Sequence, residues 1–184
     1  MATRQEILDW CRENLQVNLF KDYAPNGLQV EGRETVNKIA TSVTASKAAI
    51  DFAVEQGADM LLVHHGMFWK SEPLTITGWK KQRIETLLQH QINMVGYHLP
   101  LDAHPEWGNN AQLAALLGWE LDYQCGDQNL LNIGRLNTPQ TLQQLSDGMS
   151  DKLQRQPVIV GDMNREIKRI AWCTGGAQGF FEAA

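Results

Sequence analysis

Segments typical of β-strands and α-helices alternate along the middle of the chain, and this alternation restricts the possible folds most strongly. Apolar runs typical of strands cover residues 39–43, 59–63 and 92–97. Helical patterns cover residues 46–56, 80–90 and 109–117. Thr3 and Glu6 form a capping-box pattern ahead of apolar residues at helical spacing, so we also expect a helix at the N-terminus. Strands and helices in alternation predict an α/β fold with a mainly parallel or mixed sheet flanked by helices.

The composition is that of an ordinary globular protein and excludes several functional classes. The chain has 184 residues, of which 43% are hydrophobic, and a formal net charge of −5 without a run of basic residues. Nothing therefore indicates a nucleic-acid partner or an anionic membrane surface. No apolar run approaches the roughly 20 residues of a membrane span. Cys11, Cys125 and Cys173 lie far apart without CxxC spacing, which fits a reducing compartment, and we expect a cytoplasmic protein.

Metal-binding side chains follow two of the predicted strands. His64 and His65 end the apolar run that begins at residue 60, and His98 follows the run 92–97 with Asp102 close behind. Parallel sheets place their ligands beyond the carboxyl ends of the strands, so these side chains should meet at one edge. Imidazole and carboxylate groups suit zinc, iron, manganese or nickel. The sequence therefore predicts a metal site at this edge.

The adjacent histidines suggest two ions. Neighbouring residues of a regular strand point to opposite faces, so His64 and His65 cannot both aim at one ion while the strand remains regular. If the strand ends at Val63 and Gly66 allows a turn, each imidazole is expected to serve a different metal of a close pair. Asp102 is the best-placed bridging carboxylate. The alternative interpretation is that the histidines are only polar residues at a strand end.

The last third of the chain is harder to interpret. A polar, glycine-containing stretch covers residues 124–137, and no element is predicted in it. A helix that begins at Thr138 and Pro139 and a short strand at 158–160 are expected to follow. Residues 169–181 resemble residues 38–53, and each copy reads as strand, small-residue turn and helix. This suggests an internal β-α duplication, although two independent units of similar composition remain an alternative. The second copy ends inside its helix, so we expect a fragment with an incomplete second lobe, divided as residues 1–124 and 125–184.

Several motifs follow one another in a distinctive order. They are Asp-Tyr-Ala-Pro-Asn-Gly-Leu-Gln-Val-Glu-Gly at 22–32, Val-Thr-Ala-Ser at 43–46, Val-His-His-Gly at 63–66, His-Leu-Pro-Leu-Asp at 98–102 and Gly-Asn-Asn at 108–110. Together they resemble the YbgI family, whose members are named type 2 GTP cyclohydrolase I homologues. Their order and spacing match over the whole chain. The resemblance implies a two-lobed α/β protein that forms a ring-shaped homohexamer, with two divalent metal ions held by His64, His65 and a bridging Asp102.

The same resemblance leaves two functions open. One is a metal-dependent hydrolase that acts on a nucleotide or a related small molecule, as the family name suggests, and the other is a non-catalytic protein that stores or delivers metal. Members of the family complete the site with a histidine and a glutamate from a C-terminal segment that has no counterpart here. With only three protein ligands for two ions, we expect one weakly held metal rather than a full pair. The sequence identifies no catalytic residue.

Overall fold

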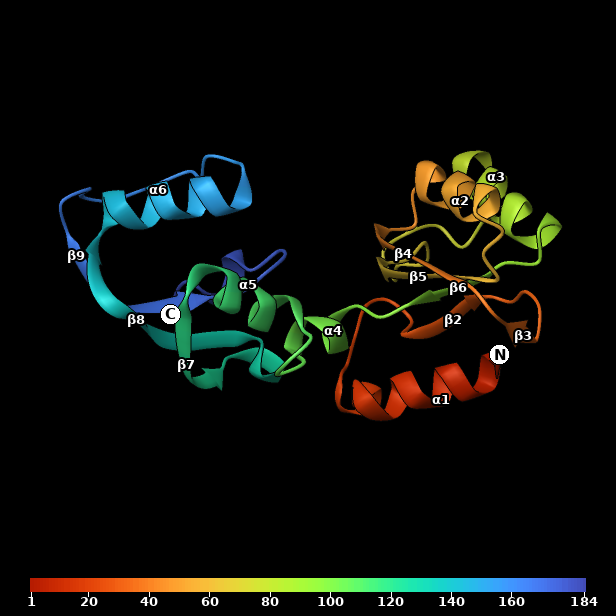
Figure 1. Cartoon of the computed structure of the whole chain (residues 1–184), viewed down its shortest axis with the longest axis horizontal. Coiled ribbons are helices and arrows are strands. Elements are labelled where there is room, and N and C mark those ends of the chain that lie inside the picture. The colour runs from red at the N-terminus through yellow and green to blue at the C-terminus, as the bar shows by residue number, and fades with distance from the viewer. The chain divides into compact units, whose positions relative to one another are not determined.

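The computed structural model describes residues 1–184, which form two compact units, Met1–Leu101 and Asp102–Ala184 (Figure 1). Both units combine sheets with flanking helices, so the expected mixed α/β class is confirmed. The predicted division of the lobes at residue 124 falls inside a strand of the second unit and stays a prediction. None of the helices is both long enough and apolar enough to cross a membrane.

The first unit is built on a four-stranded mixed sheet in the order β2-β6-β5-β4. Its strands are β2 (Gly27–Val30), β4 (Ile39–Thr44), β5 (Met60–His65) and β6 (Asn93–Gly96). Strands β4, β5 and β6 are parallel, as the alternation of strands and helices predicted, while β2 pairs antiparallel with β6. A separate pair joins the two-residue strands β1 (Ala2–Thr3) and β3 (Thr35–Val36).

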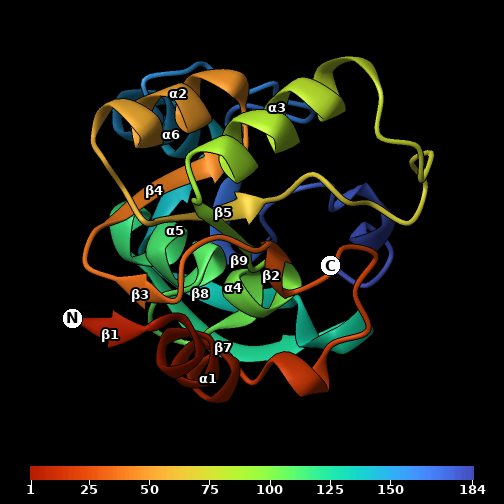
Figure 2. The same ribbon diagram turned by 90° about the vertical axis from the view of Figure 1, so that its right-hand side faces the viewer.

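Helices cover both faces of this sheet. Helices α2 (Lys47–Glu55) and α3 (Gly78–Gln89) lie side by side on one face, and α1 (Arg4–Asn14) lies on the other (Figures 1 and 2). The predicted capping box is confirmed, because the Thr3 side chain accepts from the Glu6 backbone N–H while the Glu6 carboxylate accepts from Thr3. A single 3-10 turn, η1 (Val17–Leu19), follows α1.

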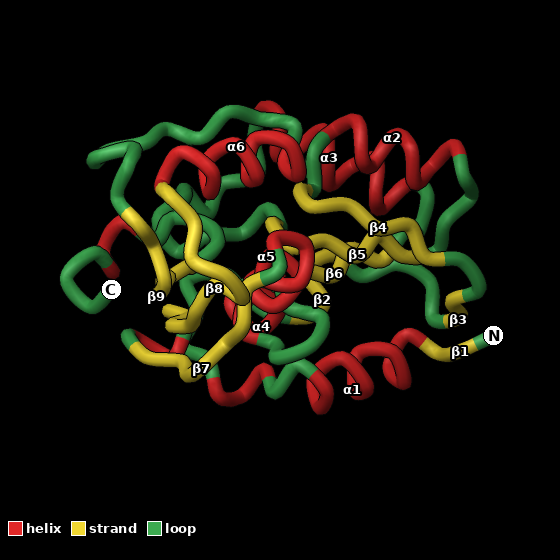
Figure 3. Tube along the Cα trace, turned by 60° about the vertical axis from the view of Figure 1, so that its left-hand side comes forward, coloured by secondary structure: helices red, strands yellow, loops and turns green.

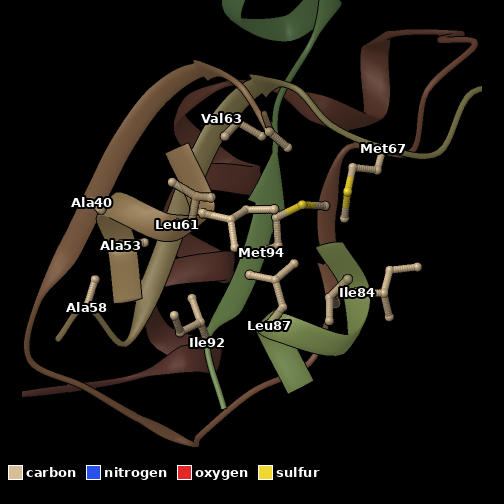
Figure 4. Close-up of a cluster of buried hydrophobic side chains, with 13 residues drawn as sticks. Ala40, Ala53, Ala58, Leu61, Val63, Met67, Ile84, Leu87, Ile92 and Met94 are labelled. Atoms are coloured by element: carbon tan, nitrogen blue, oxygen red, sulfur yellow. The ribbon is translucent and has the colours of Figure 1, made fainter. Parts of the chain in front are cut away.

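The central strands are buried on both faces, which explains their nearly continuous apolar sequences. Leu61 and Met94 pack with Leu87 of α3 in the cluster drawn in Figure 4. On the opposite face, Met60 and Val95 join the cluster that contains residues of α1. Because the sheet is held firmly from both sides, the carboxyl ends of β5 and β6 form a rigid base for the side chains that follow them.

A buried carboxylate fixes the start of β5 and gives the first testable prediction. Asp59 is 5% exposed and accepts hydrogen bonds from the backbone N–H groups of Asn37 (2.8 Å) and Lys38 (3.1 Å). It also forms an ion pair with Arg33 (3.0 Å). Burial opposes ionisation, but these partners outweigh it and lower the pKa of Asp59. Asp59→Asn should reduce the free energy of unfolding by about 2 kcal/mol in urea titrations at pH 7.

The effect of Asp59 should depend on pH with a defined sign. Its pKa is lower in the folded protein than the unfolded value of about 3.9, so its contribution is present above that pH and is lost as the pH falls through the folded value. The difference between wild type and Asp59→Asn should therefore shrink in acid. Asp51→Asn, which changes an exposed carboxylate on α2, is the matched control and should cost less than about 1 kcal/mol. If the free energies of unfolding of wild type and Asp59→Asn differed equally at pH 7 and pH 3, the stabilising role of the ionised Asp59 would be contradicted.

The second unit contains an antiparallel sheet in the order β7-β8-β9. The strands are β7 (Trp119–Cys125), β8 (Leu131–Thr141) and β9 (Glu166–Trp172), and Figure 3 shows the long β8 between the other two. The short helix α4 (Leu99–Ala103) leads into this unit. Helices α5 (Asn109–Leu117) and α6 (Leu142–Leu153) follow in it, together with the 3-10 turns η2 (Asp127–Asn129) and η3 (Gln178–Phe180). Leu113, Leu145 and Met149 from α5 and α6 pack against Trp119 and Trp172 of the sheet.

Two predictions for this unit are wrong, and one strand was not predicted. The strand is β8, which pairs with β7 at residues 131–136 and with β9 at residues 132–135 and 140–141. The helix begins after Thr141 rather than at Thr138, since the Thr141 side chain caps the Gln144 backbone N–H and Gln144 bonds back to it. Residues 158–160 form no strand, and Val158 and Val160 are 96% and 93% exposed.

The two copies of the proposed internal repeat both contain the predicted strand. Residues 39–44 and 166–172 are both strands, followed by a turn of small residues. The helix after the first copy is α2, whereas the second copy is followed only by η3. The pairing also differs, because β4 runs parallel to its neighbour β5 while β9 runs antiparallel to β8.

Candidate metal centre

Three imidazoles come together beyond the carboxyl ends of β5 and β6. His64 and His65 are the last residues of β5, and His98 follows β6 by two residues. One ligand nitrogen from each lies within 4.8 Å of the others. The expected convergence of the histidines from two neighbouring strands is thus confirmed, and it occurs within the first unit.

The end of β5 differs from the prediction. The strand does not stop at Val63 but continues to His65, which pairs with Thr44 of β4. On the other side, the pairing with β6 ends at Val63 and Gly96. The rings of His64 and His65 lie 4.3 Å apart in spite of the continued strand, so the two imidazoles share one location.

All three imidazoles contact an oxygen atom through Nδ1. His64 Nδ1 lies 3.1 Å from the Tyr97 carbonyl oxygen, His98 Nδ1 lies 3.0 Å from Asp22 Oδ1, and His65 Nδ1 lies 3.3 Å from the Thr44 hydroxyl. A carbonyl and a carboxylate only accept hydrogen bonds, so the Nδ1 atoms of neutral His64 and His98 donate. Nε2 then carries the lone pair, which is the tautomer and ring orientation that metal-binding histidines use.

Asp22 is the anchor of His98. It accepts hydrogen bonds from the backbone N–H groups of Tyr23 (2.7 Å) and Leu99 (2.9 Å) and from the Asn26 side-chain amide (3.0 Å), in addition to His98. Burial disfavours the charged carboxylate, but the hydrogen bonds from His98, Asn26 and Leu99 outweigh it and hold the pKa of Asp22 far below its usual range. Asp22 therefore stays ionised and fixes His98, a role that the sequence did not reveal.

The Gln29 side chain lies close to two glycines beside the histidines. A Cβ atom built on Gly66 would lie 2.1 Å from Gln29 Oε1, and one on Gly96 would lie 2.8 Å from Gln29 Nε2. Gln29 uses that space to accept from the Met67 backbone N–H (3.1 Å) and to donate to the Pro25 carbonyl (2.8 Å). Gly66 therefore makes room for a side-chain clamp that holds the chain where it leaves β5.

Asp102, the third predicted ligand, belongs to the second unit. It is 6% exposed, and its Oδ1 accepts from the Asn109 side-chain amide (2.8 Å) and from the Thr174 hydroxyl (3.1 Å). The group of three histidines does not include it, so its role as a bridging ligand stays a prediction. Burial and the Asp102 carboxylate raise the pKa of the Cys173 thiol, which disfavours a thiolate ligand at neutral pH.

Comparison with protein families gives the relationship of this chain. The family described as Duf34/NIF3 (NGG1p interacting factor 3) matches residues 2–184. The chain belongs to this family. Proteins named "GTP cyclohydrolase 1 type 2 homolog" are similar to it over nearly its whole length. One from Neisseria meningitidis serogroup A is 65% identical over 184 residues, and one from Escherichia coli K12 is 50% identical over 180 residues.

Solved structures agree with the family assignment. The structure titled as protein ybgI of unknown function has a TM-score of 0.95 and 48% identity, and the match covers 99% of this chain and 73% of that one. A crystal structure of a Thermus thermophilus protein has a TM-score of 0.87 and 35% identity, covering 100% and 74%. The Neisseria and Escherichia relatives are likewise covered over 74% and 72% of their lengths. The resemblance of the motifs to the YbgI proteins is therefore confirmed.

Proposed function

We propose that this DUF34/NIF3 protein binds a divalent metal ion at the histidine cluster. The observation that carries the proposal is the approach of three imidazoles whose Nδ1 atoms all contact oxygen atoms. His64 and His65 are the proposed principal ligands, with His98 beside them and Asp102 as the carboxylate that the family resemblance adds. Zinc, iron, manganese and nickel all accept this donor set. The family resemblance also implies a second ion, bridged by Asp102, and a ring-shaped homohexamer, but for this chain the proposal is one weakly held ion, because it supplies few protein ligands.

The proposed activity is metal-dependent hydrolysis of a nucleotide or a related small molecule. A divalent ion at such a site polarises carbonyl or phosphoryl oxygens and lowers the pKa of water. The chain itself contributes ligands in fixed orientation, because Asp22, Thr44 and the Tyr97 carbonyl restrain the three rings. The names of the relatives support a GTP-like substrate, and no residue of this chain is assigned as acid or base.

Turnover by the zinc-loaded protein tests the proposed activity. We expect the loaded chain to convert GTP or another nucleotide faster than the same protein after chelation, with products resolved by chromatography. His64→Ala/His65→Ala should show only the chelated rate, while His90→Ala, which changes a histidine at the end of α3, should behave as wild type. Equal rates with and without metal on every nucleotide would contradict the hydrolase.

Metal delivery is the second candidate function. His64 and His65 are only partly buried, so solvent and partner molecules can reach them more easily than they reach a closed structural site. A delivery protein should transfer its zinc to an acceptor chelator or apoprotein within minutes, whereas a catalytic site should retain zinc through many turnovers. Transfer without turnover favours delivery, and retention with turnover favours the hydrolase.

A further inference from the structure

Two aromatic side chains lie next to the histidine cluster. The Trp69 ring lies 5.1 Å from the His98 ring and 5.9 Å from the His65 ring. The Tyr23 ring lies 5.0 Å from the His98 ring and 5.9 Å from Trp69. Both therefore border the same group of imidazoles, from two loops that are far apart in the sequence.

Hydrogen bonds of the backbone join the two loops that carry these rings. The Lys70 N–H donates to the Tyr23 carbonyl (2.9 Å), and the Glu72 N–H donates to the Trp69 carbonyl (3.0 Å). The Lys70 ammonium group donates to the Asp22 carbonyl, and the Tyr23 N–H donates to the Asp22 carboxylate. The loop after β5 and the loop before β2 are thus joined directly beside Trp69. The loops that carry the rings are preorganised, which lowers the entropic cost of binding a ligand against them.

The two rings keep surface that a ligand could contact. Tyr23 is 54% exposed and Trp69 is partly buried, so aromatic surface remains open to solvent directly beside polar imidazoles. Binding sites for small molecules combine such apolar and aromatic walls with a few polar groups that fix orientation. Aromatic side chains favour ligands with planar rings. A flat heteroaromatic ring can stack on them regardless of which hydrogen-bonding groups it carries.

We propose that Trp69 and Tyr23 form a recognition wall that selects ligands with a planar heteroaromatic ring, such as a nucleobase, and presents them to the histidine cluster. The inference rests on the proposed metal function. Trp69 is a specificity-determining residue in this account, and neither ring is a metal ligand. The competing explanation is that the edge-on contacts of both rings only orient His98.

Calorimetric binding of guanosine monophosphate separates these explanations. Wild-type protein should bind this nucleotide more tightly than ribose 5-phosphate, which has the same sugar phosphate but no base. Trp69→Leu should weaken nucleotide binding at least about tenfold, while Trp69→Phe, which keeps a ring, should weaken it less. Trp10→Leu, which removes a 55% exposed tryptophan on α1 of the same unit, is the matched control and should bind as wild type.

Zinc content is measured on the same samples. It distinguishes an error in the proposed recognition wall from an error in the proposed metal site. Trp69→Leu should keep the zinc of the wild type. If Trp69→Leu lost both zinc and nucleotide binding, the Trp69 ring would only position His98, and the proposed recognition wall would be contradicted. Unchanged nucleotide binding in Trp69→Leu, or a wild type that prefers ribose 5-phosphate, would also overturn it. If wild type binds no zinc, the metal proposal fails, and nucleotide binding to the chelated protein still tests the wall.

Discussion

The double variant His64→Ala/His65→Ala should lose stoichiometric zinc binding altogether. Two of the three imidazoles that approach within 4.8 Å come from these residues, so His98 alone would remain in the first unit as an imidazole ligand. Chelator-competition titrations measure the loss directly. A second readout is stability: zinc at 100 times its dissociation constant should raise the free energy of unfolding of the wild type by about 2.7 kcal/mol and that of the variant by nothing.

The double variant should remain folded, which makes its metal loss informative. Both histidines are only partly buried at the end of β5, and neither belongs to the apolar clusters that hold the sheet. Its urea transition without metal should therefore stay close to that of the wild type. His90→Ala provides the matched control for removal of an imidazole. Wild-type zinc affinity in the double variant would place the metal elsewhere in the chain.

Asp22→Ala should produce the second large effect, on stability and on metal affinity together. The carboxylate holds the Tyr23 and Leu99 N–H groups, the Asn26 amide and His98, and its removal leaves buried donors unpaired. Breaking such a buried network costs about 3–5 kcal/mol in the free energy of unfolding. Because His98 also loses the group that fixes its ring, zinc affinity should fall about 10–100-fold.

Asp22→Asn separates the two effects of this residue. The amide keeps the size of the side chain and one acceptor oxygen but removes the charge opposite His98 Nδ1. We expect a smaller loss of stability than in Asp22→Ala, with zinc affinity still reduced. Asp9→Asn, at an exposed carboxylate of α1, serves as the control and should change neither quantity appreciably. An Asp22→Asn protein with wild-type zinc affinity would show that His98 does not depend on the charge and would remove Asp22 from the account of the metal centre.

The sequence predicted those elements whose local pattern and packing agree. The helix at 109–117 was placed correctly because Gly118 supplies the left-handed cap that ends it. The apolar runs before His64 and His98 predicted two parallel strands, and therefore the meeting of their histidines. By contrast, β8 was missed because its apolar positions are separated by Asn132, Gly134 and Arg135, which are polar or lack a side chain. The strand conformation of β8 is determined by its pairing with β7 and β9, which the local sequence pattern does not show.

The candidate site was predictable only in part, for the same reason. His64 and His65 stand out because they follow an apolar strand. Asp22 has no local signal, since its burial depends on contacts with residues 76 and 77 positions away, His98 and Leu99. The place of Trp69 is likewise not a local property, because the hydrogen bonds between its loop and Tyr23 bring it beside the imidazoles. Long-range contacts of this kind follow from the fold and not from residue spacing.

Elemental analysis of the protein, purified without chelator, tests the metal centre most directly. The measurement is the number of zinc, iron, manganese and nickel ions per chain, compared with the His64→Ala/His65→Ala variant prepared in the same way. We predict bound metal in the wild type that is absent from the variant. A wild type with no metal above the background of the variant, and none retained after incubation with zinc, would contradict the central claim that the histidine cluster is a metal centre.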